Sequence, residues 1–375
     1  MTFPDQLTVE NAADHVEALV RQELPGLMYP VDRFHGRGVV MAAGGPKFQI
    51  CAWVAIRMLR IVGCTLPIEV WYLGPGEYSA GWAELVKPYD VMCVDAHEAR
   101  KQYPHARLFG WELKPYAIQH SRFREVLFLD ADNVPVRDPS FLFETPQFQQ
   151  HGTIFWPDFG RLSRDRLAWR VFGNIQYRDE PEVESGQIVI DKARCWPALE
   201  LCHWYMQNSN NFFFRHVHGD KEVFHLAWRK LGLDYAMPSR GIDALPGVMC
   251  QHDFEGRRLF QHRNMRKWSF YHNPPTPGFQ YEDDCLQLIA ELKGKWSPAA
   301  QTLPNEADRV AIAALDGRAY EYHRMGYDHR PMVFRGDGTF ASGGAGCECC
   351  GEEARNGRPR SAPPAQARSP RSAVA

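Results

Sequence analysis

The sequence predicts an α/β fold in which helices flank a mostly parallel sheet. Between residues 31 and 296, short apolar runs that are typical of buried strands alternate with longer helical stretches. This strand–helix–strand order favours parallel strands joined by crossover helices, which cover both faces of the sheet. The chain has 375 residues, of which 45% are hydrophobic, and this is enough to bury the core of such a domain.

The first elements follow a strand–turn–helix pattern. We expect a strand at Val39–Ala42, a glycine turn over residues 42–45, and a helix that begins near Pro46 and stops at Gly63. Proline suits the first turn of a helix because its amide has no hydrogen to leave unsatisfied, and glycine suits the stop. The stretches LPIEVWYLG and DVMCVDA predict the second and third strands.

The elements that follow continue the alternation. The stretch ELKPYAIQHS predicts a helix with Pro115 in its first turn, and REVLFLDAD predicts the fourth strand. A fifth strand is expected in GTIFWPD, another at Gln187–Ile190, and a helix is expected to open at Asp220. Ligands of parallel sheets bind outside the carboxyl ends of the strands, so residues at those ends are candidates for function.

The pattern divides the chain into residues 1–30, 31–296, 297–342 and 343–375. The first segment reads as an amphipathic helical lead-in and the second is the central domain. The third is a C-terminal extension, and the fourth is so rich in glycine, alanine, proline, arginine and serine that we expect a disordered tail.

Two elements are expected in the C-terminal extension. One is a short helix at Ala307–Leu315, and the other is a hairpin in the stretch PMVFRGDGTF. The dipeptide Asp337-Gly338 provides the turn signal for this hairpin.

Charge and hydropathy favour neither a nucleic-acid partner nor a membrane-spanning segment. A net charge of -2 gives no indication of a nucleic-acid partner. The chain contains no apolar run of membrane-spanning length, and its first stretch is acidic and polar, without the apolar segment of a signal peptide. We therefore expect a cytoplasmic protein without a transmembrane segment, whose cysteines are mostly reduced core residues. The segment CECC at residues 347–350 lacks the spacing of a zinc site.

The fourth expected strand ends in two carboxylates one residue apart, Asp130 and Asp132. Burying two like charges together is costly unless a cation or protons neutralise them. Mg²⁺ and Mn²⁺ typically bind one or two carboxylates together with the phosphate oxygens of a substrate. The pair therefore predicts a divalent-metal site, and the alternative is a solvated turn, since Asp-x-Asp-Asn is also favourable turn chemistry.

Another function fits the same motif. A haloacid-dehalogenase-type phosphatase would use Asp130 as its nucleophile, but those enzymes carry this motif on their first strand, and at least two strand–helix units precede it here. The second acidic pair of such an enzyme would be Asp283 and Asp284, which open a predicted helix, where acids suit the dipole. A further alternative is a protein with the same α/β fold that binds a nucleotide sugar without catalysing a reaction.

Five stretches between residues 39 and 268 together resemble a known group of enzymes. They are GCTLPIEVWYLGPGE, LKPYAIQHSRFREVLFLDADNVPVRDPSFLF, ESGQIVID, HGDKEVFHLAW and FQHRNMRKW. In this order they resemble the metal-dependent GT-A glycosyltransferases and, among these, the fungal Mnn-type α-mannosyltransferases, although fungal members are membrane-anchored. The resemblance implies a GT-A (Rossmann-like) fold and retaining transfer of a hexose, with mannose favoured, from a nucleotide sugar to a glycan or other hydroxyl acceptor. It implies GDP-mannose as the favoured donor, UDP-hexoses next, and Mn²⁺ or Mg²⁺ as the cofactor.

The resemblance and the chemistry of such a donor assign roles at the metal. Asp130 and Asp132 would hold the cation, which stabilises the leaving diphosphate as a Lewis acid. His262 would be a third ligand, because a neutral imidazole adds a ligand without adding negative charge. Lys114 and Lys267 would neutralise the diphosphate. The alternatives are a basic surface loop around His262 and Lys267, and a solvated lysine at the start of a helix.

The resemblance also assigns the rest of the donor site. Ala43 and Gly44, in the turn after the first strand, would hold the nucleoside, and Ala131 is placed with the donor-binding residues. Glu184 would stabilise oxocarbenium charge or act as a nucleophile, and Asp220 would contact hydroxyl groups of the donor sugar. The alternatives are a plain turn, a loop acid at Glu184 and a helix N-cap at Asp220.

The acceptor is expected to lie against variable loops. Residues 161–178 and 208–216 are the candidates, because their aromatic and basic side chains suit a sugar.

Overall fold

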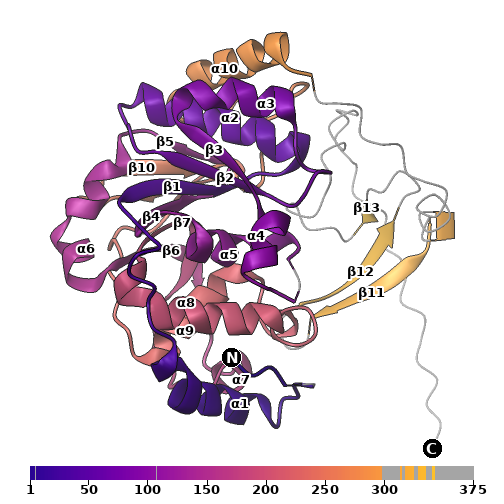
Figure 1. The fold of residues 1–375 in the computed structure, drawn as a ribbon. Helices are drawn as coiled ribbons and strands as arrows, with labels where there is room; N and C mark the ends of the chain where they lie inside the picture. The colour runs from indigo at the N-terminus through magenta and orange to yellow at the C-terminus, as the bar shows by residue number, and fades with distance from the viewer. Residues whose placement is uncertain are drawn as a thin grey trace, which may run out of the picture.

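A six-stranded sheet lies at the centre of the computed structural model, which describes residues 1–4, 6–106, 108–297, 313–314, 317–324, 328–334 and 340–342 (Figure 1). The strand order is β3-β2-β1-β4-β7-β6. The strands are β1 (Arg37–Ala42), β2 (Ile68–Tyr72), β3 (Val91–Asp95), β4 (Glu125–Leu129), β6 (Thr153–Arg161) and β7 (Pro181–Asp191). Strands β3, β2, β1 and β4 run parallel, and β7 is antiparallel to its neighbours β4 and β6. The predicted α/β class with a mostly parallel sheet is confirmed.

Strand β7 is longer than the sequence predicts. The expected strand was Gln187–Ile190, but pairing between β7 and β6 extends as far as Pro181, opposite Arg161. Glutamate, serine and glycine are weak strand formers, so this part of β7 depends on its neighbours rather than on local propensity. The interpretation of Glu184 as a loop acid is therefore wrong, because Glu184 lies within β7.

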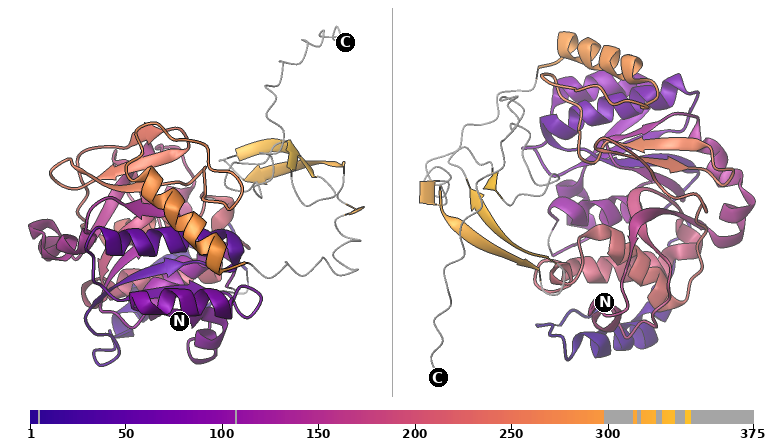
Figure 2. Two further views of the ribbon diagram at one scale, coloured as in Figure 1. Left: turned by 90° about the horizontal axis from the view of Figure 1, so that it is seen from above. Right: turned by 180° about the vertical axis from the view of Figure 1, so that it is seen from behind.

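Helices cover both faces of the sheet (Figures 1 and 2). Helices α2 (Gly45–Ile61), α3 (Ala80–Val86) and α10 (Glu282–Lys295) lie above the sheet in Figure 1, and α5 (Leu113–His120), α8 (Lys192–Gln207) and α9 (Asp220–Leu231) lie below it. Each face has its own set of buried apolar side chains. Val39 and Met41 of β1 belong to one set and Val40 to the other, as the alternation of side chains along a strand requires.

The smaller helices complete the two layers. They are α4 (Ala96–Gln102), α6 (Pro146–His151) and α7 (Ala168–Val171). The lead-in contains α1 (Ala12–Ala18) and remains helical to Gly26. Ala12 and Val16 of α1 are fully buried in the core of the face that α8 and α9 cover.

A second sheet brings a distant segment to the end of β4. It has the order β5-β10-β9-β8, with β5 (Asn133–Pro135), β8 (Asp243–Leu245), β9 (Val248–His252) and β10 (Arg258–His262). Its strands are antiparallel, and His262 pairs with Asn133. The last residue of β10 therefore lies beside the residue that follows Asp132.

The C-terminal extension contains a separate three-stranded antiparallel sheet, seen beside the main body in Figure 2. Its strands are β11 (Ala319–Arg324), β12 (Asp328–Phe334) and β13 (Phe340–Ser342). The expected hairpin matches β12 and β13, in which Phe334 pairs with Phe340. Its predicted turn, most of the predicted helix at Ala307–Leu315, and the tail with CECC lie outside the described residues.

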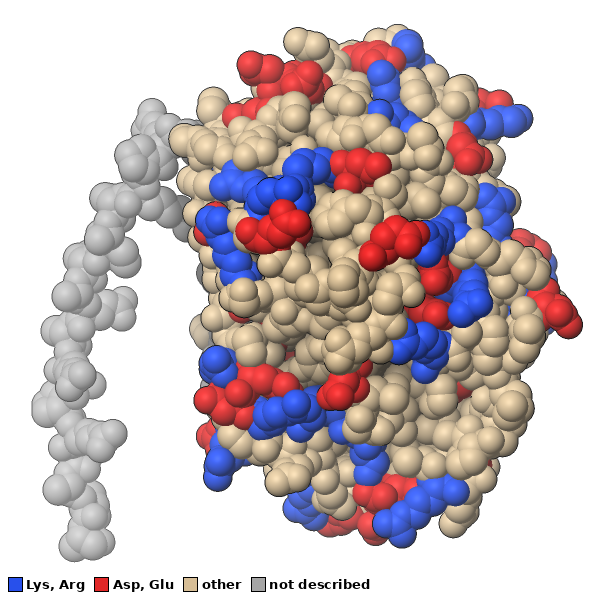
Figure 3. All heavy atoms as spheres, turned by 90° about the vertical axis from the view of Figure 1, so that its left-hand side faces the viewer, with Lys and Arg blue, Asp and Glu red and all other residues tan. Residues whose placement is uncertain are grey.

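The described surface carries both signs of charge. Figure 3 shows a face on which lysine and arginine side chains are interspersed with aspartate and glutamate. None of the helices in the described residues is both long enough and apolar enough to span a membrane. The described cysteines are all free thiols, and all but Cys93 are buried.

Candidate metal and donor site

Asp130 and Asp132 form the acidic centre of the site at the carboxyl end of β4. The amide of Asp130 still donates to the carbonyl of Gly186 on β7, at 2.8 Å, and its carbonyl accepts from the amide of Asn133 at 2.9 Å. This turn buries the side chain of Asp132, whereas a quarter of the side chain of Asp130 is exposed. The two carboxylates thus lie at the sheet edge where the sequence placed them, with Asp130 nearer to solvent.

His262 joins the two carboxylates because β10 pairs with β5. Its Nε2 atom lies 3.3 Å from Oδ1 of Asp132 and 3.7 Å from Oδ2 of Asp130. One ligand atom from each of the three residues lies within 4.8 Å of the others. Two carboxylates and an imidazole suit Mn²⁺, or Mg²⁺ completed by phosphate and water oxygens, so these residues fit the predicted metal.

The other edge of the His262 ring faces β7. Its Nδ1 atom lies 3.3 Å from Oε1 of Glu184. Burial alone would lower the pKa of His262, but the negative charges of Asp132 and Glu184 outweigh burial and raise it to about 10. Burial would likewise raise the pKa of Glu184, and the nearby His262 and Lys114 lower it instead.

Lys114 on α5 lies on the β7 side of the acidic centre. Its Nζ atom is 3.1 Å from Oδ1 of Asp130 and 2.8 Å from Oδ2 of Asp220, and it donates to both the carbonyl and the hydroxyl of Ser185 at 3.0 Å. Burial would lower the pKa of Lys114, but Asp130 and Asp220 raise it, so the lysine keeps its charge. The interpretation of Lys114 as a solvated lysine at a helix start is wrong, because its side chain is buried.

Lys267 lies beside Asp132, on the loop that follows β10. It donates to Oδ2 of Asp132 and to the carbonyl of Asn264. Arg263 in this loop is fully buried, with its guanidinium 3.6 Å from the centre of the Trp268 ring. The loop is therefore packed into the protein, and the interpretation of the whole segment as a basic surface loop is wrong.

The two aspartates differ in their electrostatic surroundings. Burial would raise the pKa of Asp132, but His262 and Lys267 lower it well below its usual range. For Asp130, burial prevails over Lys114 and His262 and raises the pKa. The cations of the protein thus compensate Asp132 better than Asp130, and a bound metal ion would supply the positive charge that Asp130 lacks.

Asp220 is the first residue of α9, and Gly219 precedes it as the N-cap. Its carboxylate does not cap the helix, because it pairs with Lys114 and accepts a hydrogen bond from the Ser185 hydroxyl at 2.9 Å. The N-cap interpretation of Asp220 is wrong. Ser185 was not singled out from the sequence, although it stands inside the quoted stretch ESGQIVID.

In the turn after β1, the side chain of Glu77 fills the space beside Gly44. A Cβ atom on Gly44 would lie 1.8 Å from Oε2 of Glu77, so glycine is needed there for a neighbouring side chain. Glu77, which follows the turn GPG after β2, has no role assigned from the sequence. The amide of Ala43 donates to the carbonyl of Trp71, and the side chain of Ala131 is buried in the core. Any ligand contact by Ala131 would therefore use its backbone.

The two candidate acceptor loops contribute fewer accessible aromatic rings than expected. In residues 208–216, Phe212 and Phe213 are buried core side chains. In residues 161–178, Trp169 and Phe172 are also buried. These rings support the fold, and nothing in their placement identifies an acceptor.

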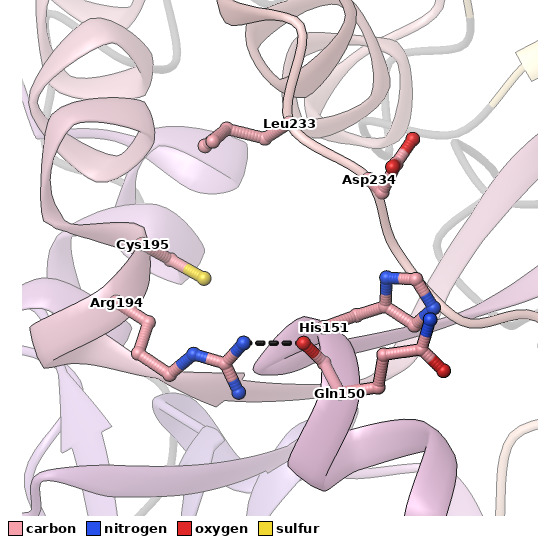
Figure 4. Close-up of a pocket in the computed structure, with 6 residues that line it drawn as sticks. All are labelled: Gln150, His151, Arg194, Cys195, Leu233 and Asp234. Atoms are coloured by element: carbon pink, nitrogen blue, oxygen red, sulfur yellow. Dashed lines mark hydrogen bonds between the residues drawn. The ribbon is translucent and has the colours of Figure 1, made fainter.

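A pocket of about 330 Å³ lies at the opposite edge of the sheet, near the start of β6 (Figure 4). It is lined by Gln150, His151, Arg194, Cys195, Leu233 and Asp234, and none of these is a predicted site residue. Arg194 donates to the carbonyls of Gln149 and Gln150 at the end of α6. Its guanidinium therefore serves to terminate that helix.

Comparison with known proteins gives a match to one family model. Residues 36–182 and 170–262 match a family model described as "Mannosyltransferase putative". The matched region contains the acidic pair, Glu184, Asp220 and His262, and it ends just before Lys267.

Individual relatives are fungal enzymes. Alpha-1,2-mannosyltransferase MNN2 of Saccharomyces cerevisiae is 25% identical over 71% of this chain and 53% of the relative. Alpha-1,2-mannosyltransferase MNN2 of Candida albicans is 29% identical over 56% of this chain and 44% of the relative. The chain thus spans about half the length of the curated relatives it matches. Among solved structures, galactosyltransferase LgtC with donor and acceptor sugar analogues covers 54% of this chain and 73% of its own, with 14% identity and a TM-score of 0.40.

Proposed function

This chain belongs to the mannosyltransferase family whose model it matches over more than half its length, and we propose that it is a metal-dependent, retaining GT-A glycosyltransferase. The observation that carries the proposal is the convergence of Asp130, Asp132 and His262 between two lysines, the buried Lys114 and the partly exposed Lys267. Three metal ligands flanked by two cations suit a substrate that carries a diphosphate.

Each residue has a defined task in this proposal. Asp130, Asp132 and His262 hold Mn²⁺ or Mg²⁺, which acts as a Lewis acid on the leaving diphosphate when bound. Lys267 and Lys114 retain their protons, because neighbouring carboxylates raise the pKa of each, and both neutralise the negative charge of the leaving group. Asp220, held by Ser185 and Lys114, is oriented to accept hydrogen bonds from donor-sugar hydroxyls.

The proposed donor is GDP-mannose, with UDP-hexoses next, and the acceptor is a glycan or another hydroxyl compound. Mannose is favoured because the named relatives are alpha-1,2-mannosyltransferases. The test is a panel of nucleotide sugars with and without Mn²⁺, scored by thermal stabilisation and by release of the nucleoside diphosphate. We expect GDP-mannose to stabilise the protein only when Mn²⁺ is present. Displacement of a labelled donor by UDP-sugars but not by GDP-mannose would exclude the mannosyl assignment.

Retention is a separate part of the proposal and has its own test. We expect the α configuration of the donor sugar to persist in the product, as measured from the anomeric coupling in an NMR spectrum. An inverted product would exclude a retaining mechanism while leaving the metal site and the donor class intact.

The phosphatase alternative receives little support from the geometry. Asp130 follows the fourth strand along the chain, and the proposed second acidic pair, Asp283 and Asp284, is exposed in the first turn of α10. Hydrolysis of a generic phosphate ester with no reaction on nucleotide sugars would favour the phosphatase. Donor binding in calorimetry without transfer or hydrolysis would favour a non-catalytic binder.

A further inference from the structure

We propose that Glu184 is a positioning residue that holds the imidazole of His262 with Nε2 directed at the metal, and that it is not the group that attacks the donor sugar. The inference rests on the proposed metal site and reassigns one residue within it. Its basis is the way in which β7 surrounds the His262 ring.

The two ring nitrogens of His262 face different partners. Nε2 lies 3.3 Å from Asp132 and 3.7 Å from Asp130, whereas Nδ1 lies 3.3 Å from Oε1 of Glu184. An imidazole that binds a metal through one nitrogen keeps its single proton on the other. A carboxylate beside Nδ1 favours the proton there, which leaves the lone pair on Nε2 for the cation.

Both oxygens of Glu184 already have neighbours that fix their direction. Oε2 accepts hydrogen bonds from the amide of Gly186 at 2.8 Å and from Nε2 of Gln187 at 2.9 Å, and Oε1 faces His262. The residue is only 7% exposed, and it lies within a strand. A nucleophile needs an oxygen that is free to approach the anomeric carbon. Here Oε2 accepts two hydrogen bonds, and Oε1 faces the His262 ring.

A chain of hydrogen bonds extends from the acidic motif to Glu184. Asn133, which follows Asp132, donates from Nδ2 to Oε1 of Gln187 at 2.7 Å and to the carbonyl of Gly186 at 2.9 Å. Gln187 in turn donates to Glu184, which faces His262. The carboxylate ligand and the imidazole ligand are therefore fixed relative to each other through Asn133, Gln187 and Glu184.

Gly186 provides the space for this arrangement. A Cβ atom at residue 186 would lie 2.4 Å from Nδ1 and 2.6 Å from Cε1 of His262. The ring is confined between β7 and the two aspartates, so even a methyl group at residue 186 would push it from its position. The three residues Glu184, Ser185 and Gly186 thus serve the site in three ways: the first orients His262, the second binds Lys114 and Asp220, and the third makes room for the ring.

The test measures Mn²⁺ binding in the absence of substrate. Mn²⁺ alone is titrated into each variant and followed by EPR, and pulsed EPR records the nitrogen coupling of a bound imidazole. For Glu184→Gln we expect Mn²⁺ affinity to fall about 10- to 100-fold, with a weakened nitrogen coupling, as for other residues that support metal ligands.

Glu184→Asp retains the charge and should recover part of the affinity. Gly186→Ala should weaken binding although Glu184 remains, and Glu182→Gln, another β7 carboxylate, should match the wild type.

Two other outcomes would contradict the inference or the metal site on which it rests. Unchanged Mn²⁺ affinity and nitrogen coupling in Glu184→Gln, with turnover lost, would overturn the inference and place Glu184 at the sugar. If the wild-type protein itself binds no Mn²⁺, the proposed metal dependence fails, and that outcome is visible before any variant is made. Circular dichroism of Glu184→Gln and Glu184→Asp establishes that each is folded, so the inference can be decided even if Gly186→Ala does not fold.

Discussion

Asp132 has more cationic neighbours than Asp130, although the two residues belong to one motif. Its carboxylate contacts His262 and Lys267, and its side chain is buried. Asp130 meets Lys114 and lies farther from His262, with part of its side chain in solvent. At the scale of single residues, therefore, we expect the two aspartates to differ in their effect on stability even though both are proposed to bind the metal.

This difference predicts that the two aspartates contribute unequally to stability and about equally to activity. Asp130→Asn and Asp132→Asn should each reduce transfer by on the order of 100-fold or more, because each removes a charge that holds the metal. In metal-free protein, Asp132→Asn should destabilise by roughly 3–5 kcal/mol, because it removes the negative charge that His262 and Lys267 share, and Asp130→Asn should cost less. Urea unfolding in EDTA measures the stabilities. Asp284→Asn, at an exposed position on α10, is the control, and wild-type activity in either motif variant would contradict the metal assignment.

A second prediction concerns Glu222 on α9, which is buried outside the metal centre. Burial raises the pKa of Glu222 to about 7, with Lys221 opposing and Glu182 adding to the shift. A raised pKa in the folded state means that this carboxyl stabilises the fold when protonated. The contribution is complete below about pH 4.5 and is lost as the pH rises through 7.

Glu222→Gln should therefore be more stable than the wild type at pH 8, by up to about 3 kcal/mol, and similar to it at pH 4.5. Thermal unfolding from pH 4.5 to 8 measures the difference. Equal unfolding curves for the two proteins across this range would show that Glu222 ionises normally.

At the scale of elements, the site depends on two strands, β7 and β10, that bring residues to the end of β4. Strand β7 supplies Glu184, Ser185 and Gly186, and β10 supplies His262 and leads into the loop that carries Lys267. That loop is held by Trp268, which is only 2% exposed and whose ring contacts the Arg263 guanidinium and the edge of Phe279.

Replacing Trp268 should therefore affect both stability and the leaving-group lysine. Trp268→Ala should lower the free energy of unfolding by about 3–5 kcal/mol, and it should reduce turnover because Lys267 loses its support. Trp268→Phe should cost less, since the Trp268 ring nitrogen has no hydrogen-bond partner among the described residues. The measurements are chemical unfolding and steady-state kinetics, and full activity in Trp268→Ala would show that the loop is held by other contacts.

At the scale of the whole molecule, the parallel part of the sheet and the second sheet form one body around the acidic centre. The described charges are mixed in sign on the face in Figure 3, which agrees with a net charge of -2 and with a site whose electrostatics are local. The cytoplasmic location expected from the sequence stays a prediction.

Metal removal should be visible in the stability of the whole protein. With Mn²⁺ and GDP each near 100 times their dissociation constants, binding should stabilise the fold by about 2.7 kcal/mol or more, and EDTA should abolish the gain. Thermal unfolding with and without EDTA provides the measurement. Asp132→Asn should show no gain from Mn²⁺, and a gain from GDP that survives EDTA would contradict metal-bridged binding.

The sequence by itself determined the α/β class, the acidic pair at a strand end and the resemblance that pointed to His262, Lys114 and Lys267. These features are local, because apolar periodicity, turn residues and short motifs are properties of neighbouring residues. The tertiary structure alone decided that Glu184 lies in a strand, that Ser185 links Lys114 to Asp220, and that Gly44 and Gly186 make room for Glu77 and His262. Those features depend on pairing between segments far apart in the chain, and the packing of one side chain against a distant backbone leaves no periodic signal in the sequence.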